Sequence, residues 1–148
     1  MYLLDTNHCS RAILKDYQIL NRLNEIDDNI VATCVITQGE LIDMAERSQR
    51  NHSNLALVQN FLQGIYIYPI DRTTAIKYGQ LKASIFKQFA PQEKSKRRKT
   101  KMINLGFDEN DLWIAAVALQ NDLIVVSSDS DFQRIKQVEN KLTVESWV

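Results

Sequence analysis

The sequence predicts a doubly wound α/β domain, in which a central parallel sheet of four to five strands is flanked by helices on both faces. Short β-rich runs alternate with helical patterns along the whole chain, which is the order found in βαβ proteins. These runs are almost continuously apolar, as strands covered on both faces are. With 148 residues the chain can bury one core but hardly two, so we expect a single domain over residues 1–148.

Four runs are predicted as strands, and a weaker fifth run follows near the end of the chain. They are residues 2–4, 30–35, 65–70, 123–127 and 142–144. Helical patterns separate them at residues 10–26, 37–50, 54–63, 72–89 and 109–121. The last of these, ENDLWIAAVALQN, is the clearest helix because it is rich in Ala and Leu and begins with acids, which a helix N-terminus favours.

Composition places the chain among folded proteins outside the membrane. Hydrophobic residues make up 45% and charged residues 24%, close to the average of globular domains. The first residues, MYLLDTN, lack the basic lead of a signal peptide, and no run approaches the roughly 20 apolar residues that cross a bilayer. We therefore expect a cytoplasmic protein without membrane association. Cys9 and Cys34 are too few for a disulfide scaffold or a zinc cage and are expected to be buried free thiols.

The charge of the chain is strongly segregated. Lys plus Arg and Asp plus Glu number 18 each, so the formal net charge is zero. Residues 94–101, KSKRRKTK, hold six basic residues and no acid, which leaves a net charge of minus six on the rest. This basic segment lies between Pro91 and Gly106, and we predict a loop over about residues 91–107.

Four acids distant in sequence are predicted to meet at one edge of the sheet. Asp5 follows the first strand, Glu40 lies in the helix after the second, and Asp129 follows the strand LIVVSS. Asp111 lies in the first turn of the Ala-rich helix. Ligands of doubly wound sheets bind beyond the carboxyl ends of the strands. Hard cations such as magnesium prefer carboxylate oxygens and need neither His nor Cys, so these acids are candidate metal ligands.

Each acid also has a structural explanation. Asp5 could cap the following helix, and Asp129 or Asp131 could cap a short helix near Phe132. Asp108 and Asp111 form a D-x-x-D spacing that fits a variant capping arrangement, and Glu40 could be an ordinary solvated residue.

The neighbours of two acids favour function over these structural explanations. Asp111 lies at the edge of the apolar stripe of its helix, and Glu40 lies between Ile36 and Met44 on its own helical face. Several carboxylates repel one another when they meet, and a bound divalent cation removes that repulsion.

Five motifs make the chain resemble the PIN-domain family, and specifically the VapC-type ribonuclease toxins of type II toxin–antitoxin systems. They are LLDTN at residues 3–7, QGELIDMAERS at 38–48, NDLWIAAVAL at 110–119, VVSSDSDF at 125–132 and the terminal LTVESW. The resemblance runs nearly from end to end, and NDLWIAAVAL is close to the most diagnostic stretch of the family. Two positions depart from it: Met44 and Asp108 stand where many relatives have glycine.

Carried over residue by residue, the resemblance implies a set of site residues. Asp5 and Asp111 would be the principal ligands of Mg²⁺, with Mn²⁺ as a substitute, and Glu40 and Asp129 would complete the catalytic acids. Thr6 and Asn7 would support the site, and Asp131 matches a position whose role varies.

The resemblance also implies an activity and partners. The chain would be a magnesium-dependent endoribonuclease that cleaves RNA by a metal-activated water. It would act as the toxin of a toxin–antitoxin pair, form a homodimer and be bound by a small cognate antitoxin. The basic segment could supply phosphate contacts from Lys94, Lys96, Arg97, Arg98, Lys99 and Lys101, although such runs are often only solvated loops.

Alternatives of other classes remain open on the sequence. A haloacid dehalogenase-like phosphohydrolase would have a second aspartate where Asn7 stands, and a dinucleotide-binding domain would have a glycine-rich turn that the chain lacks. A degenerate PIN domain that binds RNA or a protein partner without cleavage is the third alternative. We expect His8 and His52 to be structural or surface residues rather than catalytic ones, and Trp113 and Trp147 to pack in the core or an interface.

Overall fold

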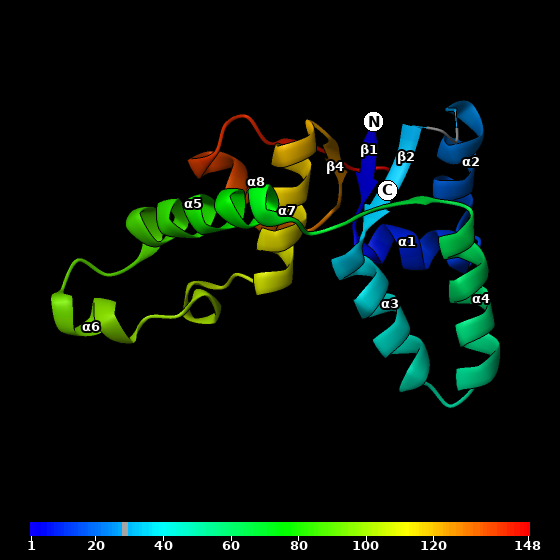
Figure 1. Cartoon of the computed structure of the whole chain (residues 1–148), viewed down its shortest axis with the longest axis horizontal. Coiled ribbons are helices and arrows are strands. Elements are labelled where there is room, and N and C mark those ends of the chain that lie inside the picture. Colours follow the sequence, from blue (N-terminus) through cyan, green and yellow to red (C-terminus); the bar gives the residue numbers. More distant parts are fainter. Residues whose placement is uncertain (28–29) are drawn as a thin grey trace.

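The computed structural model describes residues 1–27 and 30–148. Its core is a five-stranded parallel sheet with helices on both faces (Figure 1). The strands are β1 (Tyr2–Leu4), β2 (Val31–Cys34), β3 (Tyr66–Tyr68), β4 (Ile124–Val126) and β5 (Thr143–Glu145). They stand in the order β3-β2-β1-β4-β5, and Leu3 in the central strand pairs with Ala32 on one side and Val125 on the other. The predicted fold class and number of strands are confirmed.

Helices cover the two faces of the sheet in separate groups. They are α1 (Thr6–Ile13), α2 (Tyr17–Glu25), α3 (Val35–Glu46), α4 (Asn51–Gln63), α5 (Arg72–Phe89), α6 (Lys94–Lys99), α7 (Glu109–Asn121) and α8 (Ser130–Val138), with a 3₁₀ helix, η2 (Met102–Leu105). Leu3 packs with residues of α5, α7 and α8, whereas Leu4 packs with residues of α1 to α4. Successive strand residues point to opposite faces, so the two hydrophobic cores lie on either side of the sheet.

The order of the strands fixes where a ligand site can form. From β1 the chain adds β2 and β3 on one side of the sheet and then crosses to add β4 and β5 on the other. The reversal lies between β1 and β4, where the backbone N–H of Asp5 donates to the carbonyl of Val126 over 3.1 Å. This is the topological switch point, at which doubly wound sheets bind their ligands.

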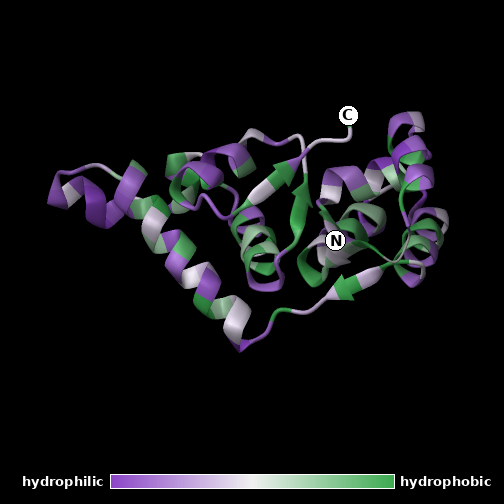
Figure 2. Cartoon of the chain, turned by 90° about the horizontal axis from the view of Figure 1, so that it is seen from above, coloured by the Kyte–Doolittle hydropathy of each residue, from purple (hydrophilic) through white to green (hydrophobic). Residues whose placement is uncertain are grey.

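The basic segment is partly helical, so the prediction of a loop over residues 91–107 was wrong. Lys and Arg are good helix formers, and six of the predicted loop residues form α6. Within α6, Lys96 pairs with the N-cap residue Glu93 over 3.4 Å. The Arg97 guanidinium lies 5.0 Å from the centre of the Phe86 ring, and this contact joins α6 to α5. Figure 1 shows α6 projecting from the side of the domain, and Figure 2 shows that it is mostly hydrophilic.

The helical pattern predicted over residues 10–26 forms two helices instead of one. Lys15 adopts a positive φ of 60°, which ends α1, and the carboxylate of Asp16 accepts hydrogen bonds from the backbone N–H groups of Gln18 and Ile19. A cap of this kind starts a new helix because it satisfies N–H groups that have no partner inside it. Both cysteines are buried and free, as predicted. No helix in the described ranges is long and apolar enough to cross a membrane.

The packing of α5 on the sheet leads to a stability prediction. Leu81 is 4% exposed and belongs to the core, whereas Ile76 on the same helix is 60% exposed. Leu81→Ala should lower the free energy of unfolding by about 3 kcal/mol because it leaves a cavity, and Ile76→Ala should change it by less than about 0.5 kcal/mol. Urea denaturation followed by circular dichroism measures both; equal losses would contradict this placement of α5.

Candidate active site

A cleft of about 660 Å³ opens at the carboxyl edge of the sheet, and all four predicted acids line it. Asp5 comes from the end of β1, Glu40 from α3, Asp111 from α7 and Asp129 from the turn after β4. Thr6 and Asn7 from the first turn of α1 line it too. The structure therefore brings together residues from four segments that are distant in the sequence.

Helix capping explains how two of these acids are held. Asp5 is the N-cap of α1, and its carboxylate accepts from the backbone N–H of His8 over 2.8 Å. Asp129 is the N-cap of α8 and accepts from the backbone N–H of Asp131 over 2.9 Å. The capping explanation is therefore correct for both residues. It does not compete with a site, because a cap uses one carboxylate oxygen and leaves the other one free of that bond.

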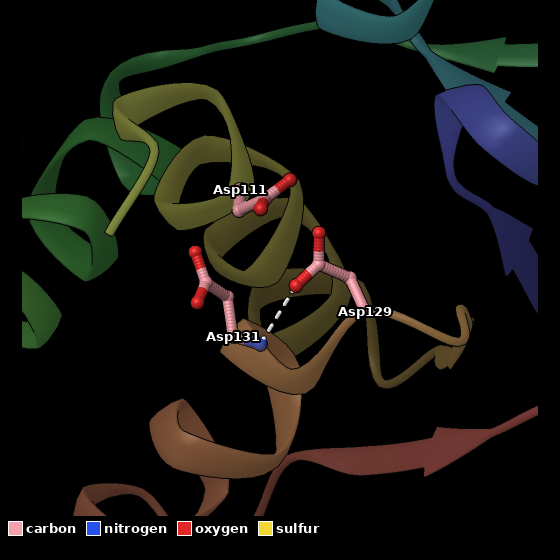
Figure 3. Close-up of side chains that lie close together, drawn as sticks. All are labelled: Asp111, Asp129 and Asp131. Atoms are coloured by element: carbon pink, nitrogen blue, oxygen red, sulfur yellow. Dashed lines mark hydrogen bonds between the residues drawn. The ribbon is translucent and has the colours of Figure 1, made fainter. Parts of the chain in front are cut away.

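Three carboxylates lie closest together in the cleft. The family resemblance ranks Asp5 and Asp111 first as metal ligands, and only Asp111 belongs to this group. Oxygens of Asp111, Asp129 and Asp131 lie within 4.8 Å of one another, and Figure 3 shows the three side chains close together at the ends of α7 and α8. Asp5 lines the same cleft but is outside this group of three. Asp131, whose role the sequence left undecided, thus lies beside two of the predicted catalytic acids. An all-oxygen set of this kind suits a hard divalent cation.

The carboxyl of Asp111 has a strongly raised pKa. Burial raises the pKa of its carboxyl to about 8, and the negative charges of Asp129, Asp108, Asp131 and Asp5 add to the effect in that order. Burial also raises the pKa of Asp131, although a hydrogen bond from the backbone of Asp108 opposes the shift. Low dielectric and neighbouring carboxylates both disfavour ionisation. Ionisation of the Asp111 carboxyl is therefore unfavourable at this position.

Glu40 is held at both of its carboxylate oxygens. Oε1 accepts a 2.8 Å hydrogen bond from the side-chain amide of Asn110, and Oε2 accepts from the hydroxyl of Thr6. The hydroxyl of Thr6, whose single proton goes to Glu40, also lies 3.4 Å from the hydroxyl of the buried Thr37. Glu40 thereby joins α1, α3 and α7 across the cleft. Its two oxygens already have protein partners, so its geometry favours a positioning role over direct metal binding.

Arg134 fixes the outer wall of the acidic cluster. Its guanidinium lies 3.9 Å from the centre of the Phe107 ring and donates to the carbonyls of Leu105 and Gly106 over 2.7 and 3.1 Å. It also lies 3.7 Å from a carboxylate oxygen of Asp131. One cation thus holds the segment before α7 against α8 and partly balances the acid beside it.

The predicted RNA-binding residues lie outside the cleft. Five of them are on α6, Lys101 lies just before η2, and none lines the cleft. Lys96 pairs with Glu93 and Arg97 packs on Phe86, whereas Lys94, Arg98 and Lys99 have no ion pair among the described residues. The structure therefore separates the acidic site from a solvated group of cations.

The sequence interpretation missed two residues that act on the site. Asn110 entered the sequence analysis only as the first residue of the motif NDLWIAAVAL, although its amide donates to Glu40. His8 was expected to be a structural or surface residue rather than a catalytic one; it is buried, and its ring contacts the Asp5 carboxylate. Its position three residues after Asp5, one helical turn away, was the available signal. Trp147 is buried as predicted, and Trp113 stacks on Tyr78.

Comparison with known proteins identifies relatives over nearly the whole chain. A family model described as PIN domain matches residues 2–138. The chain is 33% identical over 151 residues to Ribonuclease VapC2 of Haemophilus influenzae, which covers 99% of this chain and 98% of that protein. It is 29% identical to the tRNA(fMet)-specific endonuclease VapC of Shigella flexneri, with 99% and 97% covered. The structure of DNA-bound VapBC from Salmonella typhimurium matches with a TM-score of 0.79 at 28% identity, over 99% of this chain and 98% of that one.

The raised pKa of Asp111 leads to a prediction on pH and stability. In the metal-free protein the folded state keeps a proton to about pH 8, whereas the unfolded chain loses it near its ordinary value of 3.8. The folded state binds more protons in this window, so the free energy of unfolding should fall as the pH rises from about 4 to 8. Asp111→Asn should flatten this decline and be more stable than wild type at pH 8.

Urea unfolding in the presence of chelator, at several pH values, measures this effect. Asp122→Asn is the matched control, because it changes the same residue type at the other end of α7, where Asn also tolerates the positive φ of 53°. The control should keep the wild-type slope. The same slope in Asp111→Asn would show that this carboxyl is not the source.

Proposed function

This chain is a member of the PIN-domain family, and from that premise we propose that it is a magnesium-dependent endoribonuclease that acts as the toxin of a toxin–antitoxin pair. One observation carries the proposal: acids from four separate segments line a single cleft at the switch point of the sheet. The relatives named as ribonuclease and endonuclease support the activity. Carboxylates alone repel a phosphodiester. A cleft of acids can therefore act on RNA only when it holds a metal ion, as in a metal-dependent nuclease.

The donor set fits magnesium. Asp5 and Asp111 are the proposed principal ligands, and Asp129 and Asp131 complete the acidic pocket. Carboxylate oxygens of Asp111, Asp129 and Asp131 lie within 4.8 Å of one another, which supports binding of one ion between these three residues. A divalent cation there would offset the repulsion that raises the pKa of Asp111, and Mn²⁺ could replace Mg²⁺ because both accept oxygen ligands.

The residues of the cleft would divide the work of hydrolysis. When bound, magnesium lowers the pKa of a coordinated water and neutralises charge on the phosphate. Asp5 and Asp111 would hold the ion, and Glu40, tied to Thr6 and Asn110, keeps the opposite wall of the cleft in position. Hydrolysis would break the bond between phosphorus and the 3′ oxygen, with the hydroxyl of a water added to phosphorus and a proton to the 3′ oxygen. The products would be a 5′-phosphate and a 3′-hydroxyl, as the resemblance implies.

Proposed partners follow from the relatives. The Shigella protein is named for tRNA(fMet), so a transfer RNA is the first substrate to test. The Salmonella relative was solved as VapBC, which supports a small antitoxin as the partner of this chain, and we expect a homodimer. RNA as the substrate is consistent with action in the cytoplasm. The remaining alternative is a degenerate PIN domain that binds RNA or a protein partner without cleavage, and the cleavage assay below separates it from the proposed function.

Loss of the metal or of its ligands should abolish cleavage. EDTA should stop RNA cleavage by the purified protein, and excess Mg²⁺ should restore it. Asp5→Asn and Asp111→Asn should each lower the cleavage rate at least about 100-fold, because even residues that only support a metal ligand typically contribute 10- to 100-fold. Gel analysis of labelled tRNA measures the rate, with Asp122→Asn as the control. Cleavage that survives EDTA and both substitutions would refute the mechanism.

The free cations of α6 should supply the salt-dependent part of RNA binding. Lys94, Arg98 and Lys99 have no ion pair in the described parts of the chain, so they are available to phosphates. Their replacement by Ala should weaken RNA binding and reduce the slope of log K against log salt by up to about 2, since each contact to a single strand contributes about 0.7.

Fluorescence anisotropy at several salt concentrations measures this slope on the Asp111→Asn background, which prevents cleavage. A matched triple substitution of lysines outside α6, Lys15, Lys136 and Lys141 to Ala, removes the same charge from the chain. Equal effects of the two triple variants would show that only the net charge matters and that α6 makes no specific contact.

A further inference from the structure

His8 is a buried histidine to which the proposed mechanism assigns no role. It lies in the first turn of α1 and is 1% exposed. Its backbone N–H donates to Oδ1 of Asp5 over 2.8 Å, and its ring Nδ1 lies 3.0 Å from the same oxygen. Asp5 is itself only 3% exposed. The helix cap needs only the first of these bonds, so the ring contact is an additional constraint on the carboxylate.

The chemistry of the two groups fixes the direction of the ring contact. An ionised carboxylate only accepts hydrogen bonds, so Nδ1 of His8 must carry the proton that is shared with Asp5. Oδ1 of Asp5 then receives two donors from one residue. No hydrogen bond to Oδ2 occurs within residues 1–27 and 30–148, and Asp5 lines the cleft. Oδ2 is therefore the oxygen that remains free for a cation.

The other ring nitrogen argues against a purely structural role. Nε2 of His8 is buried and has no hydrogen-bond partner among the described residues. An unpaired buried polar atom lowers stability, so an apolar side chain such as Leu would serve packing better at this position. Polar groups that are buried at such a cost call for a specific explanation, and the bond to Asp5 provides one.

We propose that His8 is a positioning residue that holds Asp5 through Oδ1 and presents Oδ2 to the metal ion, so that Asp5 binds the metal through one oxygen. This inference rests on the proposed function, because it takes Asp5 as a metal ligand. His8 acts through Asp5 and does not itself touch the metal or the RNA. Residues that orient a metal ligand typically change the affinity for the metal 10- to 100-fold when they are replaced.

Calorimetric titration with Mn²⁺ and with Mg²⁺, in the absence of RNA, tests the inference without using activity. His8→Leu removes the ring donor and should weaken metal binding about 10-fold. His8→Asn places an amide nitrogen on Cγ, where Nδ1 is attached in histidine, and should keep the affinity within about threefold of wild type. His52→Leu, a change of the exposed histidine on α4, is the matched control and should leave the affinity unchanged.

Thermal unfolding of the metal-free variants separates positioning from packing. Because Nε2 is unpaired, His8→Leu should be at least as stable as wild type and yet bind metal more weakly. Unchanged affinity in His8→Leu, or equal weakening in His8→Leu and His8→Asn, would overturn the role of His8. If His8→Leu fails to fold, His8→Asn decides, and a loss of affinity greater than about threefold in that folded variant overturns the inference.

The two proposals fail in different ways. Wild-type protein that binds neither Mn²⁺ nor Mg²⁺ and cleaves RNA in EDTA would overturn both the metal mechanism and the role of His8. Wild-type protein that binds metal while His8→Leu binds it equally well would overturn the role of His8 alone.

Discussion

Repulsion between carboxylates is the constraint on which this structure depends. The parallel sheet directs β1 and β4 to the same edge, and the chain places Asp5 and Asp129 directly beyond them, with Asp111 opposite. Burial and the neighbouring negative charges raise the pKa of Asp111 to about 8, because they disfavour the ionised form of its carboxyl.

Helix N-termini stabilise the negative charge of three carboxylates at the cleft. Asp5, Asp108 and Asp129 are the N-caps of α1, α7 and α8, so each accepts a backbone N–H at the positive end of a helix. The same sequence features that start three helices therefore also hold negative charge at the cleft. A capping role and a metal-binding role are two uses of one position, because the cap commits one oxygen of a carboxylate and leaves the other available.

The acidic cleft and the basic helix α6 lie apart, so the charges needed for metal binding and for RNA binding do not neutralise each other. An RNA phosphate is repelled by an acidic pocket and attracted by cations, so one surface cannot do both tasks without neutralising itself. Here Lys94, Arg98 and Lys99 lie on a short helix at the side of the domain, and no described basic residue lines the cleft (Figure 1). The cleft thereby keeps the charge that favours a divalent cation.

The sequence by itself determined the parallel sheet, the helices and the edge at which the acids meet. Apolar runs and helical periodicity are local signals, and the carboxyl ends of parallel strands share an edge whatever the details of packing. Asp5, Glu40, Asp111 and Asp129 could thus be assigned to one site before any coordinates. The helical state of residues 94–99 was missed because a charge run carries no apolar periodicity, although Lys and Arg favour helix.

Only the tertiary structure decided which atoms meet within the site. Asp131 joins Asp111 and Asp129, Asn110 and Thr6 bind the two oxygens of Glu40, and the ring of His8 binds Asp5. His8 with Asp5 and Asp131 with Asp129 are local pairs, whereas the other contacts link segments from different parts of the chain. Their distances depend on how α1, α3, α7 and α8 pack on the sheet, and no local pattern of residue types records that packing.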